Sequence, residues 1–321
     1  MLVSVILLLL GLVILSVSSD MLIESVIRLA KKLKISKLVI SLTLVALGTS
    51  IPETVVSLIS ALKGSNIAFS NVVGSNIANI ALILGVSLLI GNITLNKEMK
   101  LEINKMMLVK LLLLVLCIIT GFCLNKIAGI VMVFCLGGYV FSLYRISKNQ
   151  GNVEEEVEES EELISKIGSV LFKNEWILII VYVICGFLGL IGGGELVVEN
   201  AIKIAQTLNI NEGIIGATIV AIGTSLPELM TSISAMKKKH YDIVIGNIVG
   251  SNIINILLIL GISSILVEIK IETFEILSVL MMLFVSFVFY IMAKKKENLT
   301  KINGIILLVL YLASTILLTK I

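Results

Sequence analysis

Two six-residue segments carry the side chains of this chain that are best suited to binding a cation. The first, "GTSIPE", occupies residues 48–53, and the second, "GTSLPE", occupies residues 223–228. Each combines hydroxyl groups, a carboxylate and backbone carbonyls, and neither contains histidine or cysteine. Oxygen ligands of this kind suit hard cations such as Ca²⁺ and Na⁺ rather than Zn²⁺ or Cu⁺. The pair of segments therefore predicts an oxygen-only cation site.

The prolines of these segments, Pro52 and Pro227, are the only two in 321 residues. A proline has no N–H, so the carbonyl four residues earlier loses its helical partner. These carbonyls belong to Gly48 and Gly223. We therefore expect a kink in each helix, with carbonyls from Ala46 to Thr49 and from Ala221 to Thr224 turned toward a cavity. The threonine and the glutamate of each segment are four residues apart, which places them on one helical face.

A polar stripe with four-residue spacing follows each segment along the chain. Its members are Asn71, Ser75 and Asn79 in the first half, and Asn247, Ser251 and Asn255 in the second. A helix places side chains at this spacing on one face, so the stripe can form a second wall of the site. The same side chains could instead join neighbouring helices by hydrogen bonds, and the residues alone leave both interpretations open. Gly74 and Gly250, beside the stripe, predict close helix packing.

The composition is that of a membrane protein. Hydrophobic residues make up 58% of the chain and charged residues 15%, with a mean hydropathy of +1.11. Ten apolar stretches are each long enough to cross a bilayer. They lie near residues 2–27, 38–62, 68–92, 106–124, 127–144, 176–202, 212–236, 242–267, 272–293 and 303–319. The predicted fold is therefore all-α, a polytopic membrane protein with ten transmembrane helices.

The two halves of the chain resemble each other. "SDMLIESVIRLAKKLKIS" (19–36) aligns with "GELVVENAIKIAQTLNIN" (194–211) at an offset of 175, which also superposes the two proline segments. "NVVGSNIANIALILG" (71–85) matches "NIVGSNIINILLILG" (247–261) at an offset of 176. These matches indicate an internal duplication with five spans in each copy.

The basic residues predict the orientation of the spans. Twenty of the 25 Lys and Arg residues flank alternate loops, which places those loops in the cytoplasm and the N-terminus outside the cell membrane. Because each copy has an odd number of spans, the second enters the membrane upside down relative to the first. The prediction is two inverted five-helix repeats, residues 1–145 and 176–321, joined by an acidic cytoplasmic linker, residues 146–175.

The glutamates of the proline segments fall close to the middle of their predicted spans. An ionised carboxylate at the bilayer centre costs several kcal/mol unless it faces a cation, water or a cavity. Glu53 and Glu228 are therefore the strongest candidates for a transport site. Four further acidic residues recur in both halves toward the span ends, where a structural or gating pairing is expected: Asp20, Glu24, Glu195 and Glu199.

Other functional classes fit the residues poorly. No basic patch with interleaved aromatic residues is present, so we expect no nucleic-acid partner. No nucleophile–base set is present, so we expect no enzyme. The expected partners are membrane lipid and inorganic cations, with no cofactor and with function as a monomer. His240 lies in a basic loop and is expected to be solvated, as is the acidic run 154–162.

These features together resemble the cation/calcium exchanger superfamily, and the chain is most similar to its prokaryotic-type sodium/calcium exchangers. The resemblance covers the whole chain and rests on "GTSIPE" with "GSNIAN" (74–79), and on "GTSLPE" with "GSNIIN" (250–255). It implies antiport of Ca²⁺ against Na⁺ by alternating access, in which the long first and sixth spans slide across the other helices.

The resemblance also implies the ion ligands. In the first repeat they are Ala46, Thr49, Ser50, Glu53, Ser75 and Asn79, and in the second Ala221, Thr224, Ser225, Glu228, Ser251 and Asn255. The metal ligands proper among them are Glu53, Glu228, Thr49 and Thr224. Many sodium/calcium exchangers have an aspartate where this chain has Asn255, so this centre holds two carboxylates. An H⁺/Ca²⁺ or K⁺-dependent exchanger is the alternative, and a cation channel is a more distant one.

Overall fold

The computed structural model describes residues 2–63, 67–149, 174–208, 223–295 and 297–319. Within them the chain is helical apart from turns and four two-residue strands, which confirms the all-α prediction. Most of the predicted linker and the first part of the seventh predicted span lie outside the described residues. The candidate ligand Ala221 also lies outside them.

The helices of the first half follow one another through short connections. They are α1 (Leu2–Leu33), α2 (Lys37–Ile40), the π-helical segment η1 (Ser41–Val45), α3 (Ala46–Thr49), α4 (Ile51–Leu62), α5 (Ile67–Ala78), the π-helical segment η2 (Asn79–Ile83), α6 (Leu84–Ile90), α7 (Lys97–Ile119) and α8 (Lys126–Asn149). Strand β1 (Ile93–Thr94) precedes α7, and strand β2 (Cys123–Leu124) precedes α8.

The described part of the second half repeats elements of the first half in the same order. They are α10 (Glu175–Thr207), α13 (Leu226–Lys237), α14 (Tyr241–Ile254), the π-helical segment η4 (Asn255–Leu260), α15 (Gly261–Leu266), α16 (Thr273–Lys295) and α17 (Lys301–Thr319). Strand β3 (Ile269–Lys270) precedes α16, and strand β4 (Asn298–Leu299) precedes α17.

Within the described residues, seven helical runs are long and apolar enough to cross a membrane. The bent pair Lys37–Thr49 and Ile51–Leu62 makes eight if it forms one span. Helix α7 does not qualify, because Glu102, Lys105 and Lys110 lie in its otherwise apolar part. Each of the ten predicted spans overlaps a helix of the structure. The number of ten membrane crossings and the inverted arrangement remain predictions.

Corresponding elements of the two halves recur at the offset found in the sequence. Helix α16 begins and ends 176 residues after α7, and η4 begins 176 residues after η2. Strand β1 pairs antiparallel with β4, and β2 pairs antiparallel with β3. At this spacing β1 corresponds to β3 and β2 to β4, so the two pairings are equivalent contacts. Each of them joins one half of the chain to the other.

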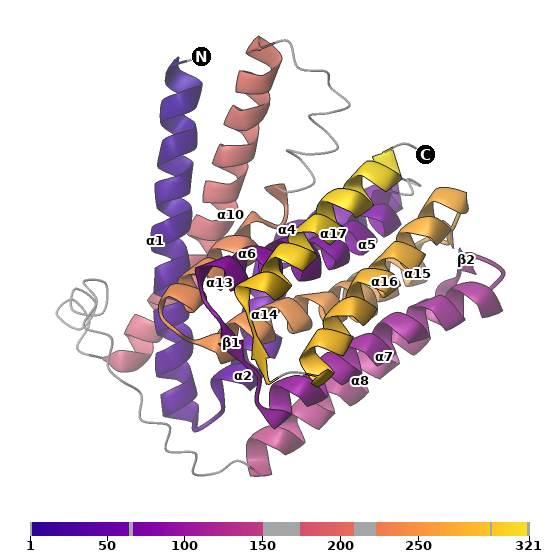
Figure 1. The fold of residues 1–321 in the computed structure, drawn as a ribbon, viewed down its shortest axis with the longest axis horizontal. Helices are drawn as coiled ribbons and strands as arrows, with labels where there is room; N and C mark the ends of the chain where they lie inside the picture. The colour runs from indigo at the N-terminus through magenta and orange to yellow at the C-terminus, as the bar shows by residue number, and fades with distance from the viewer. Residues whose placement is uncertain (1, 64–66, 150–173, 209–222, 296, 320–321) are drawn as a thin grey trace.

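The two longest helices, α1 and α10, lie side by side and are steeply inclined to the other helices (Figure 1). Glycines allow their backbones to approach closely. A Cβ atom built on Gly11 would lie 3.1 Å from the carbonyl oxygen of Gly193, and one on Gly193 would lie 3.2 Å from the carbonyl oxygen of Gly11. Such small-residue contacts are a common way for membrane helices to pack.

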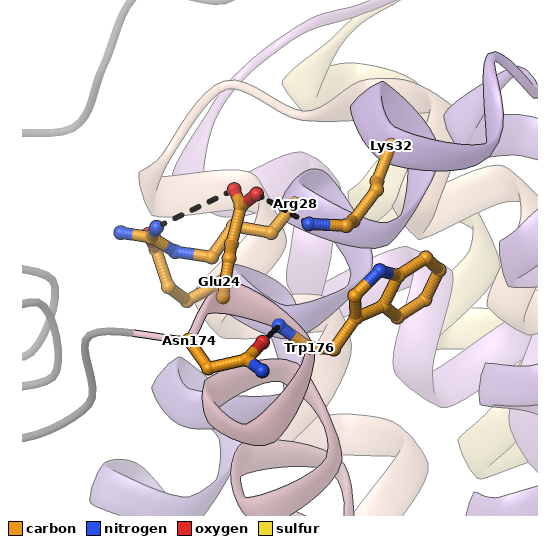
Figure 2. A network of polar contacts seen from close by, with 6 residues as sticks. Glu24, Arg28, Lys32, Asn174 and Trp176 are labelled. Carbon is orange, nitrogen blue, oxygen red and sulfur yellow. Dashed lines mark hydrogen bonds and ion pairs between the residues drawn. The ribbon is translucent and has the colours of Figure 1, made fainter.

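Ion pairs also join α1 to the beginning of α10 (Figure 2). Lys32 Nζ lies 2.8 Å from Glu175 Oε2, and Arg28 Nη1 lies 4.0 Å from Glu175 Oε1. Arg28 Nε also pairs with Glu24 Oε1 at 2.9 Å, and the Lys32 ammonium lies 4.8 Å from the ring centroid of Trp176. Partly exposed pairs contribute little individually. Together with the glycine contacts, they hold α1 and α10 against each other.

Helix α14 lies at the centre of the molecule. All its residues from Ile243 to Ile254 are buried, and it packs against α3, α7 and α13. Gly250 permits the close packing predicted for it, since a Cβ atom there would lie 2.8 Å from the carbonyl oxygen of Leu42. The same prediction is wrong for Gly74, where a Cβ atom would meet no described atom within 4 Å. Gly74 lies on the exposed side of α5, whereas α14 is enclosed on all sides.

Candidate cation-binding site

The first proline segment interrupts its helix, as predicted, and in the second half a helix begins at the equivalent position. The run Lys37–Thr49 is inclined by 50° to Ile51–Leu62. In the second half α13 begins directly after Ser225, whose φ of −93° and ψ of 8° are no longer helical. The proline of each segment lies in the first turn of the new helix, where its missing N–H has no intrahelical partner to lose. Each glutamate shares this first turn, where the helix N-terminus stabilises negative charge.

Each half of the chain hydrogen-bonds the glutamate of the other half. Ser50 Oγ donates to Glu228 Oε1 at 3.0 Å, and Ser225 Oγ donates to Glu53 Oε1 at 3.2 Å. Both glutamates are 1% exposed, and their charges lie close enough to interact. The other oxygen of each carboxylate, Oε2, has no hydrogen-bond partner among the described residues. A buried carboxylate oxygen without a protein donor is well suited to a cation.

Asn247 connects the two proline segments. Thr49 Oγ1 donates to Asn247 Oδ1 at 3.1 Å, and Asn247 Nδ2 donates to the backbone oxygen of Glu228 at 3.2 Å and to Ser232 Oγ at 3.1 Å. The amide is therefore engaged by protein groups at both of its polar atoms. For this member of the polar stripe, interhelical bonding is the correct one of the two interpretations. Residue spacing alone does not reveal it.

The Ala46 carbonyl is not released by the proline kink, which corrects the prediction. It still accepts the N–H of Ser50 at 3.2 Å, because the helical bond that the proline removes belongs to Gly48. The hydroxyls of Thr49 and Ser251 also approach the Ala46 oxygen, each at 3.5 Å. This carbonyl is thus surrounded by hydroxyl groups from both halves of the chain.

The two later asparagines of the stripe begin π-helical segments. Asn79 is the first residue of η2 and Asn255 the first of η4. Segment η2 packs against α13 and η4 against α4, so each meets the glutamate-bearing helix of the other half. Both asparagines are 1% exposed, yet Asn79 Oδ1 and both polar side-chain atoms of Asn255 lack partners among the described residues. Short π-helical turns are frequent at functional sites.

Of the remaining candidate ligands that the structure describes, Ser75 is buried and Thr224 is half-buried. Ser75 is 5% exposed, and Thr224 Oγ1 has no hydrogen-bond partner within the described part of the chain. Seven of the twelve candidates hydrogen-bond to other candidates: Ala46, Thr49, Ser50, Glu53, Ser225, Glu228 and Ser251. Carboxylate, hydroxyl, amide and carbonyl oxygens from both halves therefore meet in one buried region, which fits a hard cation.

His240 is half-buried at the start of α14, which corrects the expectation that it is solvated. Burial first, and then the charges of Lys37 and Lys238, lower its pKa to about 4. The unfolded chain, with a histidine pKa of about 6.5, takes up the proton first as the pH falls. The free energy of unfolding should therefore decrease between about pH 6.5 and pH 4.

We expect His240→Gln to reduce this acid destabilisation. Because His240 is only half-buried, the difference in melting temperature should be a few degrees at most. Thermal unfolding of both proteins across the same pH range measures it. Identical decreases in melting temperature would show that His240 does not resist protonation in the folded protein.

Comparison with known proteins gives the family. The family model described as sodium/calcium exchanger protein matches residues 3–146 and 178–320, one segment in each half. The sodium/calcium exchanger MaX1 of Methanosarcina acetivorans is 30% identical, with 98% of each chain covered. The putative antiporter CaxA of Alkalimonas amylolytica is 33% identical over 83% of this chain and 82% of that protein.

A solved structure agrees with these sequence matches. The sodium-calcium exchanger NCX_Mj, soaked with 2.5 mM Na⁺ and 10 mM Sr²⁺, superposes with a TM-score of 0.80 at 31% identity, and 98% of each chain is covered. The resemblance drawn from the paired motifs is thereby confirmed. This chain belongs to the sodium/calcium exchanger protein family.

Proposed function

We propose that this protein exchanges Ca²⁺ for Na⁺ across the cell membrane by alternating access, with the ions bound between its two halves by the twelve candidate ligands. The observation that carries the proposal is the crossed pairing of the buried glutamates. Each half supplies a serine to the other half's glutamate, and each carboxylate keeps one oxygen without a protein donor. Because both halves contribute ligands, the positions of the ligands relative to one another change whenever the halves move relative to each other.

Charge explains how the two ions would compete. Glu53 and Glu228 together carry a charge of −2, which is costly to move without a cation through an occluded, low-dielectric state. One Ca²⁺ neutralises this charge, and Na⁺ ions at overlapping positions do so as well. Because both ions use the same oxygens, they cannot occupy the site together. Only loaded carriers then cross, which makes the protein an exchanger and not a leak.

The strand pairings support the proposed orientation. Strands β1 and β4 lie in the third-to-fourth and ninth-to-tenth loops, which the basic residues assign to the cytoplasm. Strands β2 and β3 lie in the fourth-to-fifth and eighth-to-ninth loops, which are assigned to the outside. Paired strands must be on the same side of the membrane. Both pairings satisfy this requirement if the second repeat is inverted.

A contact between α1 and α13 supports alternating access. Ser234 Oγ donates a hydrogen bond to Asp20 Oδ1, and Lys238 Nζ lies 3.7 Å from the same oxygen. In the proposed orientation this contact lies at the cytoplasmic side. It joins the long first helix to the helix that begins with the second glutamate segment.

The corresponding contact of the other repeat is open. At an offset of 175, Asp20 corresponds to Glu195, and Lys238 corresponds to Lys63. Glu195 and Lys63 are both exposed, and neither forms an ion pair within the described residues. The difference supports a conformation that is closed toward the cytoplasm. In the opposite conformation, Glu195 and Lys63 would form the equivalent pair on the outside.

Ion fluxes in proteoliposomes test the proposal. An outward Na⁺ gradient at constant pH should drive uptake of radioactive Ca²⁺, and collapse of that gradient should stop it. Uptake driven by a pH gradient without Na⁺ would contradict the assignment of the counter-ion and support an H⁺/Ca²⁺ exchanger. Ca²⁺ entry without any counter-ion would instead indicate a channel.

A further inference from the structure

Lys110 is a fully buried lysine in the middle of the predicted membrane helix α7. Its side chain is 0% exposed. Lys110 Nζ donates to Asn252 Oδ1 at 2.7 Å and to Ser286 Oγ at 2.8 Å. Ser286 Oγ in turn donates to the backbone oxygen of Met282 at 2.5 Å, so it accepts the hydrogen bond from the lysine. No carboxylate of the described residues forms an ion pair with Lys110.

A lysine in this position requires an explanation. A charged side chain within a membrane helix is costly and usually marks a functional region. The two partners of Lys110 are neutral, so they solvate the ammonium group without cancelling its charge. The buried glutamates that form no ion pair among the described residues are Glu53, Glu228 and Glu275. Glu275 lies in the first turn of α16, whereas Glu53 and Glu228 lie at the cation site.

One helix separates Lys110 from the cation site. Asn252 follows Ser251 directly in α14, and consecutive helical residues point about 100° apart. The Ser251 hydroxyl reaches the Ala46 carbonyl on the site, whereas the Asn252 amide reaches Lys110 on α7. The ammonium therefore lies behind the wall of ligands, where low-dielectric protein screens its charge less than water would.

Comparison of the two repeats shows that only the first has a lysine at this position. At an offset of 176, Lys110 corresponds to its own partner Ser286, and Asn252 corresponds to Asn76. Asn76 Nδ2 donates to the backbone oxygen of Val72 at 2.9 Å, as Asn252 Nδ2 does to that of Ile248 at 2.7 Å. Asn76 Oδ1, however, has no donor among the described residues. The two asparagines and their backbone hydrogen bonds are thus repeated in both halves, whereas the lysine occurs in the first half only.

We propose that Lys110 is protonated in the folded protein and, as a fixed positive charge, sets the ion preference of the site by opposing Ca²⁺ more strongly than Na⁺. Coulomb repulsion scales with the product of the charges, so a fixed +1 charge acts twice as strongly on a divalent ion as on a monovalent one. The two carboxylates of the site still carry −2, and the ammonium behind them makes the electrostatic potential at the site less negative. The inference rests on the proposed function in requiring that the site binds both ions.

Direct binding measurements on the purified full chain test this, with Ca²⁺ alone and Na⁺ alone as probes. Lys110→Met should tighten binding of both ions, by about fivefold per Na⁺ and by about the square of that factor, 25-fold, for Ca²⁺. Lys110→Arg keeps the charge and should leave the ratio of the two affinities within about twofold of the unmodified protein. Equal changes for both ions, or the same change in both variants, would indicate a purely structural role and overturn the proposal.

A second route to the same change of charge covers the case in which Lys110→Met does not fold. Asn252→Asp places a carboxylate against the ammonium group and cancels its charge without removing it. It should reproduce the preferential gain for Ca²⁺, and unchanged relative affinities would overturn the proposal. If the unmodified protein binds neither ion, the proposed function itself fails. Intact binding with unaltered preference in these variants overturns only the role of Lys110.

Discussion

Replacing Glu53 or Glu228 by glutamine is expected to abolish Ca²⁺ transport and to leave the protein folded. Each carboxylate supplies one of the two negative charges of the site, and each has one oxygen free for the ion. Removing one member of a buried, compensating charge set costs about 3–5 kcal/mol. That cost corresponds to roughly a hundredfold to several thousandfold weaker Ca²⁺ binding. Na⁺-driven Ca²⁺ uptake into proteoliposomes measures the loss.

Thermal unfolding separates loss of the site from loss of the fold. Without ions, two neighbouring buried carboxylates repel each other, so either variant should melt at the same or a higher temperature than the unmodified protein. Added Ca²⁺ should stabilise the unmodified protein, by about 2.7 kcal/mol at a hundredfold excess over Kd, and should not stabilise the variants. Near-normal uptake by either variant would contradict the assignment.

Glu275 provides a matched control for these variants. It is also a buried glutamate, but its carboxylate accepts the backbone N–H of Glu272 at 3.1 Å and the Ser70 hydroxyl at 3.4 Å. A glutamine can keep both contacts, because its amide oxygen can accept the N–H of Glu272 while its NH₂ group donates to the Ser70 hydroxyl. Glu275→Gln should therefore retain both Ca²⁺ uptake and stabilisation by Ca²⁺. Its loss of uptake would show that burial of a glutamine, and not the charge of the site, disables the protein.

The breaks in the glutamate helices were predictable because proline acts locally. A missing N–H removes one specific helical bond whatever the surroundings. The first segment does interrupt its helix, and a helix begins at the equivalent position of the second. The duplication was also predictable, because the two halves contain matching segments at a constant offset. The offset predicts that Ser50 corresponds to Ser225, but it does not predict the hydrogen bonds that each serine makes to the glutamate of the other half. Those bonds depend on how two segments 175 residues apart pack together.

The roles of the asparagines could not be separated by spacing. Asn247 and Asn255 share one predicted face, yet Asn247 is saturated by protein partners and Asn255 has none among the described residues. Asn247 lies in the regular helix α14, whereas Asn255 begins a π-helical segment, which has no simple residue signature. Which interpretation holds at each position is thus decided by tertiary packing.

Helix α7 shows the limit of hydropathy as a guide to helix boundaries. The predicted span 106–124 lies inside an apolar stretch, whereas the helix runs from Lys97 to Ile119. Asn96 caps its start by accepting the N–H of Met99 at 2.8 Å. Gly121, with a φ of 62°, follows its end. The charged first turns of this helix extend beyond the apolar stretch, so a search for apolar length misses them.

Bridging α1 to α13 is expected to stop transport. Alternating access requires the long helices to move across the remaining ones, and the Asp20–Ser234 contact would close and open in each cycle. Asp20→Cys and Ser234→Cys, combined in a protein whose four native cysteines are replaced, place two thiols at this contact. A short bifunctional reagent that forms a disulfide with each thiol should then remove about 90% or more of Na⁺-driven Ca²⁺ uptake, because a carrier held in one conformation cannot turn over.

The equivalent positions of the other repeat provide a control pair for this experiment. Ile59 and Glu195 correspond to Ser234 and Asp20 at an offset of 175, and both are exposed in the present conformation. The pair Ile59→Cys and Glu195→Cys should therefore bridge slowly at rest and faster when ions on both sides keep the carrier cycling, since only the opposite conformation brings the two positions together. Each single-cysteine variant should keep its uptake after treatment, and reduction of the bridge should restore transport. Full uptake through a protein bridged between positions 20 and 234 would show that α1 does not move against α13, and the alternating-access proposal would then fail.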